Sequence, residues 1–148
     1  MRIASLVGAV LLVAAPVFAH VGVTPRESKL GATETYAFQV PSEGGMMTTS
    51  VVLDVPDSVT IVSVKSPASA THEEKKVGDR IVSVTWTVQI GAGASASLSV
   101  VAKNPTRGSE IAWKVHQKYS DGMSSDWVGA ADSRAPAPVT KLGAADAK

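Results

Sequence analysis

The sequence predicts an all-β fold, an antiparallel β-sandwich of immunoglobulin-like or cupredoxin-like type. Two observations support this prediction. Apolar residues recur at every second position, which is the spacing of a strand with one buried face. Turn-forming residues separate these runs at intervals of about 10–14 residues, as expected where short strands follow one another. No segment carries a sustained helical stripe, so we expect helices to contribute little to the core.

The strands can be placed in order along the chain. Their predicted ranges are 20–24, 36–40, 48–55, 59–65, 82–88, 96–100 and 111–119. The alternation is clearest at the positions that share one face: Tyr36, Phe38 and Val40; Val82, Val84, Trp86 and Val88; Ala96, Leu98 and Val100; Ile111, Trp113, Val115, Gln117 and Tyr119. Turn signals between the runs lie at 41–45, 56–57, 91–93, 104–105 and 121–122. The charged run 73–76 is expected to form a solvated loop or hairpin tip.

Residues 1–19 have the features of a cleaved secretory signal peptide. Arg2 provides a positive start, residues 3–15 are almost all apolar, and Val17 and Ala19 are small residues at positions −3 and −1 of a cleavage site. We therefore expect residues 20–135 to form a single β-sandwich domain and 136–148 to be a flexible Pro/Ala-rich tail. Neither end contains the roughly 20 apolar residues of a membrane span. We expect no membrane anchor and a periplasmic or secreted protein.

Composition excludes several classes of function. The chain has 148 residues, with 14 basic and 13 acidic side chains and no cysteine. Cleavage after Ala19 would leave 129 residues with 13 charges of each sign. Such a balance lacks the basic surface of nucleic-acid-binding proteins, so we expect no nucleic acid partner. Without cysteine, disulfides, thiolate metal sites and thiol nucleophiles are excluded. No catalytic motif stands out, and we expect a protein that is not an enzyme.

Cleavage after Ala19 would make His20 the amino-terminal residue. Its α-amine and its imidazole Nδ1 could then hold one metal ion in a chelate. Both groups lose a proton easily near neutral pH, because their reference pKa values are about 7.7–8.0 and about 6.5. Nitrogen donors without a thiolate favour copper(II) among the divalent ions. The alternative is that His20 is an accidental first residue, and this position alone does not decide between the two.

Several segments together resemble the YcnI-like family of exported copper-binding domains. They are the segments 20–25 (His-Val-Gly-Val-Thr-Pro), Gly31, 40–43 (Val-Pro-Ser-Glu), 48–49, 117–122 (Gln-Lys-Tyr-Ser-Asp-Gly), 127–129 and 135–138. The similarity thus runs from His20 to about Pro138. It implies that copper(II) is bound by a one-histidine brace at the mature N-terminus, helped by a glutamate and a tryptophan. The matching positions are His20, Glu43 and Trp127.

The resemblance also implies a role in copper homeostasis, as a copper chaperone or buffer. The copper ion is then the cargo, and another exported copper chaperone or a cuproenzyme is the candidate partner. Glu43, in a loop bounded by proline and glycine, would add an anionic oxygen ligand; otherwise it is a solvated carboxylate. Trp127 would shield the ion and interact with it through the ring face; otherwise it packs in the core.

Other candidate ligands are weaker on their residues alone. His72 lies in a polar segment and is expected to be solvated, and His116 is expected to be an exposed strand residue opposite the apolar face. Met46 and Met47 follow Glu43 closely, and thioethers suit copper(I). Because adjacent strand residues point to opposite faces, at most one of the two would join the site. The alternative for both is packing in a loop.

Two other functions remain open at the level of sequence. One is a metal-free β-sandwich that serves as an interaction module of the cell envelope. The other is a copper-dependent oxidoreductase, which would need a second histidine beside His20, and neither His72 nor His116 has a convincing position for it. Mass spectrometry of the mature terminus separates the first of these from the copper hypothesis, because the whole site depends on where the chain begins.

Overall fold

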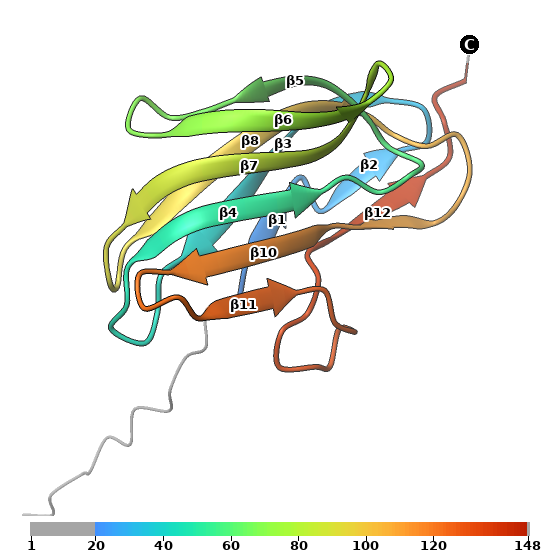
Figure 1. The fold of residues 1–148 in the computed structure, drawn as a ribbon. Coiled ribbons are helices and arrows are strands. Elements are labelled where there is room, and N and C mark those ends of the chain that lie inside the picture. Colours follow the sequence, from blue (N-terminus) through green and yellow to red (C-terminus); the bar gives the residue numbers. More distant parts are fainter. Residues whose placement is uncertain (1–19, 148) are drawn as a thin grey trace, which may run out of the picture.

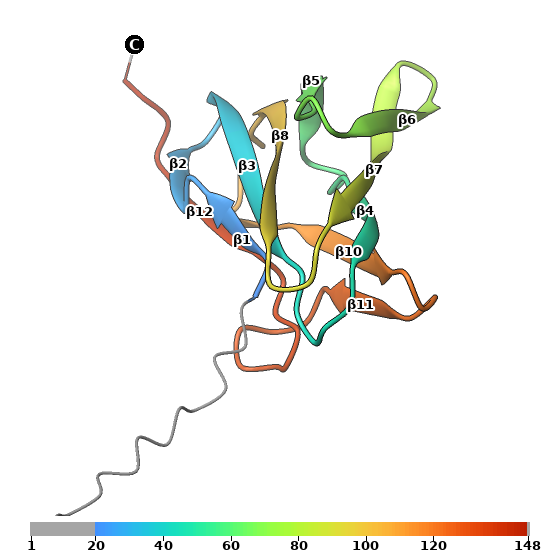
Figure 2. The ribbon, with the colours of Figure 1, turned by 90° about the vertical axis from the view of Figure 1, so that its left-hand side faces the viewer.

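The computed structural model describes residues 20–147 as two antiparallel sheets that face one another across a shared apolar core (Figures 1 and 2). The predicted signal peptide, residues 1–19, lies outside the described residues, as does residue 148. One sheet has the strand order β1-β3-β8-β5, formed by Gly22–Thr24, Thr33–Pro41, Ser95–Lys103 and Thr60–Lys65. The other has the order β11-β10-β4-β7-β6, formed by Ser124–Trp127, Lys114–Tyr119, Thr48–Asp54, Arg80–Ile90 and Thr71–Val77. The predicted antiparallel all-β sandwich is confirmed.

The core is built by the alternation that the sequence shows. In β3, Tyr36, Phe38 and Val40 are fully buried while the residues between them are not. The ring of Trp113 lies 4.8 Å from that of Tyr36 and 5.2 Å from that of Phe38, measured between centroids. Such tilted aromatic contacts add stabilisation beyond the area that they bury. Trp113, which directly precedes β10, thereby packs against β3 of the opposite sheet.

The C-terminal segment differs from its expected flexible tail. Residues Val139–Gly143 form β12, which pairs in parallel with β2 (Glu27–Lys29) and antiparallel with β9 (Glu110–Ala112) in a third, small sheet. The fully buried Thr140 accepts a hydrogen bond from the indole of Trp113 at 3.2 Å and donates one to the carbonyl of Pro25 at 2.9 Å. The Pro/Ala-rich composition of this segment did not indicate a strand, because the strands that β12 pairs with come from distant parts of the chain.

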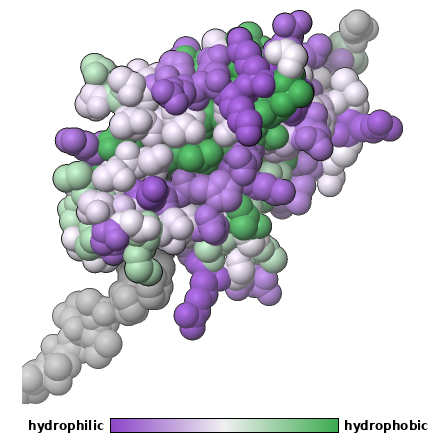
Figure 3. Space-filling model, in the orientation of Figure 1, coloured by the Kyte–Doolittle hydropathy of each residue, from purple (hydrophilic) through white to green (hydrophobic). Residues whose placement is uncertain are grey.

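Two further elements differ from prediction. The charged run 73–76 is part of the edge strand β6, where all seven residues are exposed. Figure 3 shows the hydrophilic side chains over this edge, and such charges protect an unpaired edge from joining another sheet. The predicted strand 111–119 divides at Trp113 into β9 and β10, which belong to different sheets. Within residues 20–147, no helix is long and apolar enough to cross a membrane.

One end of the sandwich brings together the start of β1 and three connections between strands. Strand β1 begins there, and three connections turn there: the β3–β4 loop (42–47), the β7–β8 turn (91–94) and the β10–β11 turn (120–123). In Figure 1 these three connections lie at the left-hand end of the sandwich. Backbone hydrogen bonds join the loops, from Ser42 to Ala94 at 2.9 Å and from Ser120 to Met47 at 2.9 Å. We call it the N-terminal end of the sandwich.

We predict that β12 contributes to stability through Thr140. Thr140→Val keeps the shape of the side chain but leaves the Trp113 indole and the Pro25 carbonyl without this partner. Leaving a buried polar group unsatisfied costs about 1–3 kcal/mol, so the free energy of unfolding should fall by at least that amount. Urea unfolding of residues 20–148 measures it. Thr60→Val, on the exposed side of β5, is the matched control, and an equal loss in both variants would contradict the prediction.

Candidate metal site

His20 lies at the N-terminal end of the sandwich and is exposed to solvent. Strand β1 pairs antiparallel with β3, with Gly22 opposite Gln39, so the same register continued outward faces His20 toward Pro41. The strand thus delivers His20 to the start of the loop that carries Glu43. His20 and this loop come from different segments of the chain, and the β1–β3 pairing brings both to the same end of the sandwich.

Trp127 is the partner that the structure places directly beside His20. The centroids of the two rings are 5.7 Å apart, with an angle of 54° between their planes. Trp127 ends β11, lies opposite Val115 of β10, and is only 9% exposed. In the sequence, Trp127 belongs to no alternating apolar run. In the structure, it packs at the edge of the hydrophobic core. The indole is therefore held firmly while one part of it contacts the His20 ring.

A buried amide orients this tryptophan. The indole N–H of Trp127 donates to Oε1 of Gln117 at 3.1 Å. The Nε2 of Gln117 donates to the carbonyl of Pro41 at 2.8 Å and to the hydroxyl of Thr48 at 2.6 Å. Gln117 has no exposed surface, so these bonds are shielded from water. One side chain thus connects the tryptophan to both ends of the β3–β4 loop.

Sequence reasoning assigned no role to Gln117, although a signal was present. It is the one amide among the apolar and aromatic residues of the buried face 111–119. A polar group at such a position needs partners, because an unsatisfied buried amide is costly. A glutamine at this position indicates that other polar groups accept hydrogen bonds from its amide and donate hydrogen bonds to it. Which residues do so was not predictable, because they lie in other strands.

Glu43 lies in the β3–β4 loop, next to the fully buried Ser42. The hydroxyl of Ser42 donates to the carbonyl of Met46 at 2.7 Å and shares a hydrogen bond with that of Thr48 at 2.8 Å. Gly44 and Gly45 follow with φ angles of 72° and 74°, a left-handed region that favours glycine. The loop is thus held in a defined shape. Glu43 is partly buried and lines the cavity between this loop and the β10–β11 turn.

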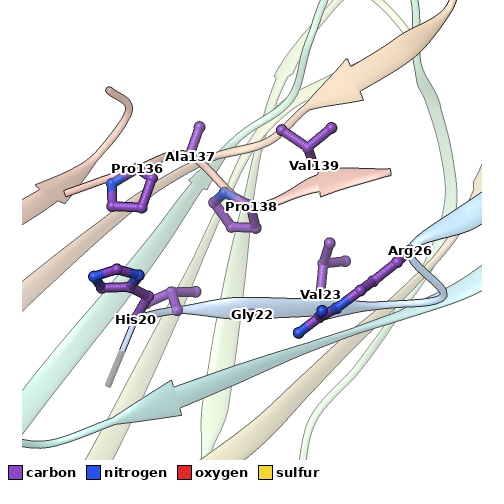
Figure 4. A pocket seen from close by; sticks show the side chains of 9 residues that line it. His20, Gly22, Val23, Arg26, Pro136, Ala137, Pro138 and Val139 are labelled. Carbon is purple, nitrogen blue, oxygen red and sulfur yellow. The ribbon is translucent and has the colours of Figure 1, made fainter. Parts of the chain in front are cut away.

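A second hollow is lined by His20 itself. It is a groove of about 410 Å³ between β1 and residues 136–139. Figure 4 shows His20 and Pro136 at one end of the groove and Arg26 at the other. The imidazole is therefore accessible at the groove end that lies away from the positive charge of Arg26. The structure brings His20 and Trp127 into contact and brings the Glu43 loop to the same end of the sandwich.

The other two histidines have different surroundings. His72 was expected in a solvated segment; it lies on the exposed edge strand β6, with Nδ1 2.6 Å from the hydroxyl of Ser66. His116 was expected to be exposed, but it is half-buried between two carboxylates. Its Nε2 is 2.8 Å from Asp54 and its Nδ1 is 2.7 Å from Asp126. Among residues 20–147, no three His, Cys, Asp or Glu side chains gather as a metal ion would need.

Comparison with known proteins gives the chain a family. Residues 20–142 match the domain of unknown function DUF1775. The chain belongs to this family. This DUF1775 domain is similar to the copper-binding protein CutI of Bacillus subtilis (strain 168), with 38% identity over 141 residues that cover 93% of the chain and 69% of CutI.

Solved structures agree with the fold of this DUF1775 domain. An uncharacterized protein from Nocardia farcinica, described as immunoglobulin-like, superposes with a TM-score of 0.70 at 23% identity, covering 83% of this chain and 97% of that one. A cohesin module from Archaeoglobus fulgidus has a TM-score of 0.51 at 12% identity, covering 86% and 91% of the two chains. These likenesses concern the fold alone. Of the two sandwich types that the sequence predicts, they confirm the immunoglobulin-like one.

The carboxylates beside His116 give this DUF1775 domain a pH-dependent contribution to stability. Burial by itself lowers the pKa of His116, but hydrogen bonds and charges from Asp126 and Asp54 outweigh it, so the pKa is raised above its ordinary value of 6.5. Folding therefore favours the protonated imidazole. The resulting stabilisation is fully present below the pKa of the unfolded state and is lost as the pH rises through the raised pKa of the folded state.

We predict that His116→Gln destabilises the domain more at about pH 5.5 than at about pH 8.5, because only the protonated imidazole attracts both carboxylates. Urea unfolding of the two proteins at each pH measures the difference. An NMR titration of the imidazole should place its pKa above 6.5, and the double variant Asp54→Asn/Asp126→Asn should bring it down. A destabilisation that grows with pH would contradict this assignment.

Proposed function

We propose that this DUF1775 domain is an exported copper(II)-binding protein that acts in copper homeostasis, as a chaperone or buffer. The observation that carries the proposal is the contact between His20 and Trp127 at the end of the sandwich that also holds the Glu43 loop. The similarity to CutI, a protein named for copper binding, supports it. The protein is proposed to be periplasmic or secreted, with residues 1–19 removed as a signal peptide.

Signal peptide removal would create the principal ligand set. Cleavage after Ala19 frees the α-amine of His20, and the amine and Nδ1 together chelate one ion. Copper(II) suits two nitrogen donors with an oxygen donor, because it has the highest affinity of the divalent series and accepts tetragonal N,O geometry. Glu43 is proposed as the oxygen donor, whose charge offsets part of that of the ion. Trp127 covers one side of the imidazole and limits the access of water.

A binding role fits the chain better than a catalytic one. A two-histidine site would need a second free imidazole near His20. His116 has both ring nitrogens in contact with carboxylates, and His72 lies on the exposed edge strand β6. Copper is thus proposed as cargo held by His20, Glu43 and Trp127. Another exported copper chaperone or a cuproenzyme is the proposed partner that gives or receives it.

The first test titrates copper(II) into chains that begin at His20, followed by electron paramagnetic resonance. One equivalent should bind with nitrogen hyperfine structure. Two modifications each remove half of the chelate: His20→Ala, and acetylation of the α-amine, which is selective near pH 7 because lysines are still protonated. Loss of a group that only hydrogen-bonds to a metal ligand lowers metal affinity about 10- to 100-fold. Each modification removes a ligand itself, so each should lower the copper(II) affinity about 100-fold or more. Undiminished binding by the acetylated chain would overturn the brace.

The second test concerns Gln117 as a positioning residue. Gln117→Met keeps the volume but removes the partner of the Trp127 indole and of the Pro41 carbonyl, so both the shield and the Glu43 loop lose their orientation. We expect a loss of about 10-fold or more in copper(II) affinity, as for other outer partners of a metal. Thr140→Val is the matched control, because it breaks buried hydrogen bonds elsewhere in the core. Equal copper affinity in the two variants would reduce Gln117 to a purely structural role.

A further inference from the structure

The methionines of residues 20–147 all lie at the N-terminal end of the sandwich. Met46 and Met47 end the β3–β4 loop, and Met123 ends the β10–β11 turn. Backbone hydrogen bonds hold the two loops in place: Ser120 donates to the carbonyl of Met47 at 2.9 Å, and Tyr119 donates to that of Met123 at 2.9 Å. The fold thus collects thioethers from sequence positions far apart. Figure 3 shows moderately hydrophobic residues on the surface at this end.

Two of these thioethers border one cavity. Met46 and Met123 line an open hollow of about 350 Å³ between the two loops, together with Tyr119. Met123 is 66% exposed, so it does not serve to fill the core. Met46 and Met47 precede β4 rather than lying within it, so the strand alternation that would turn one of them away does not apply. Met47 is 39% exposed and is absent from the lining of the hollow.

The charge of the hollow favours a cation. Glu43 and Asp121 lie in its lining, which contains no lysine or arginine. Thioether sulfur is a soft, neutral ligand that selects copper(I), whereas nitrogen and oxygen donors suit copper(II). Two thioethers with carboxylates at the rim therefore differ in kind from the donors offered by His20. The hollow combines soft ligands with the negative charge that a monovalent cation needs.

We propose that this hollow is a copper(I) site in which the Sδ atoms of Met46 and Met123 bind the ion. It goes beyond the copper(II) site proposed at His20, and it lies next to that site because Glu43 belongs to the loop that both share. The chain would then hold copper in two oxidation states at neighbouring positions. The copper(I) site does not require the free amine of His20, so it exists whether or not the brace forms.

The test is a competition for copper(I) under anaerobic, reducing conditions, with bicinchoninate as the coloured competitor. The unmodified chain from His20 should withdraw one equivalent. Met46→Leu/Met123→Leu keeps the apolar volume, a type of exchange that usually costs under about 1.5 kcal/mol in stability. This double variant should lose about 100-fold in copper(I) affinity, more than the loss of an outer partner causes. Met47→Leu, an adjacent thioether outside the lining, should leave the affinity unchanged.

The outcomes separate this site from the copper(II) brace. His20→Ala should retain copper(I) binding while losing copper(II), and the double methionine variant should retain the copper(II) resonance spectrum. The proposal is overturned if the unmodified chain does not compete for copper(I), or if the double variant competes as well as the unmodified chain. It is also overturned if Met47→Leu loses as much copper(I) affinity as the double variant. Failure of copper(II) binding alone would overturn the proposed brace and leave the methionine site standing.

Discussion

The arrangement of the N-terminal end depends on one buried amide. Gln117 has no exposed surface, and its two ends contact the indole of Trp127, the carbonyl of Pro41 and the hydroxyl of Thr48. If this amide lost its partners, several polar groups would be buried without hydrogen bonds. Together with the Ser42–Thr48 hydrogen bond and the backbone hydrogen bonds of the loops, this side chain fixes the β3–β4 loop relative to strands β10 and β4.

Around this amide, the site is assembled from three kinds of constraint. Strand pairing brings His20 to the level of Pro41, hydrogen bonding orients Trp127, and two glycines with positive φ shape the loop that carries Glu43. None of these alone would place a ligand. Together they hold side chains from β1, the β3–β4 loop and β11 at one end of a rigid scaffold. A metal ion bound there, as proposed, would require little rearrangement of these side chains.

The electrostatic pattern of the domain also has a physical basis. Residues 20–148 carry 13 basic and 13 acidic side chains, so their formal net charge is zero, yet charges are separated locally. Carboxylates flank His116 on strands β4 and β11, charged residues cover the edge strand β6, and Arg26 lies at the far end of the groove from His20. Among the residues that line the two hollows, Arg26 is the only arginine or lysine, and it lies away from His20.

Local patterns in the chain were enough to predict the all-β class, most of the strands and the residues of their buried faces. They were enough because strand periodicity is a local property, written in every second residue. The sequence also pointed to His20, Glu43 and Trp127, through local segments and their resemblance to a family. The features that local patterns left open depend on pairing between distant segments. These features are strand β12, the carboxylates beside His116, the partners of Gln117, and the hollow that Met46 and Met123 both line. No local pattern records which strand lies next to which.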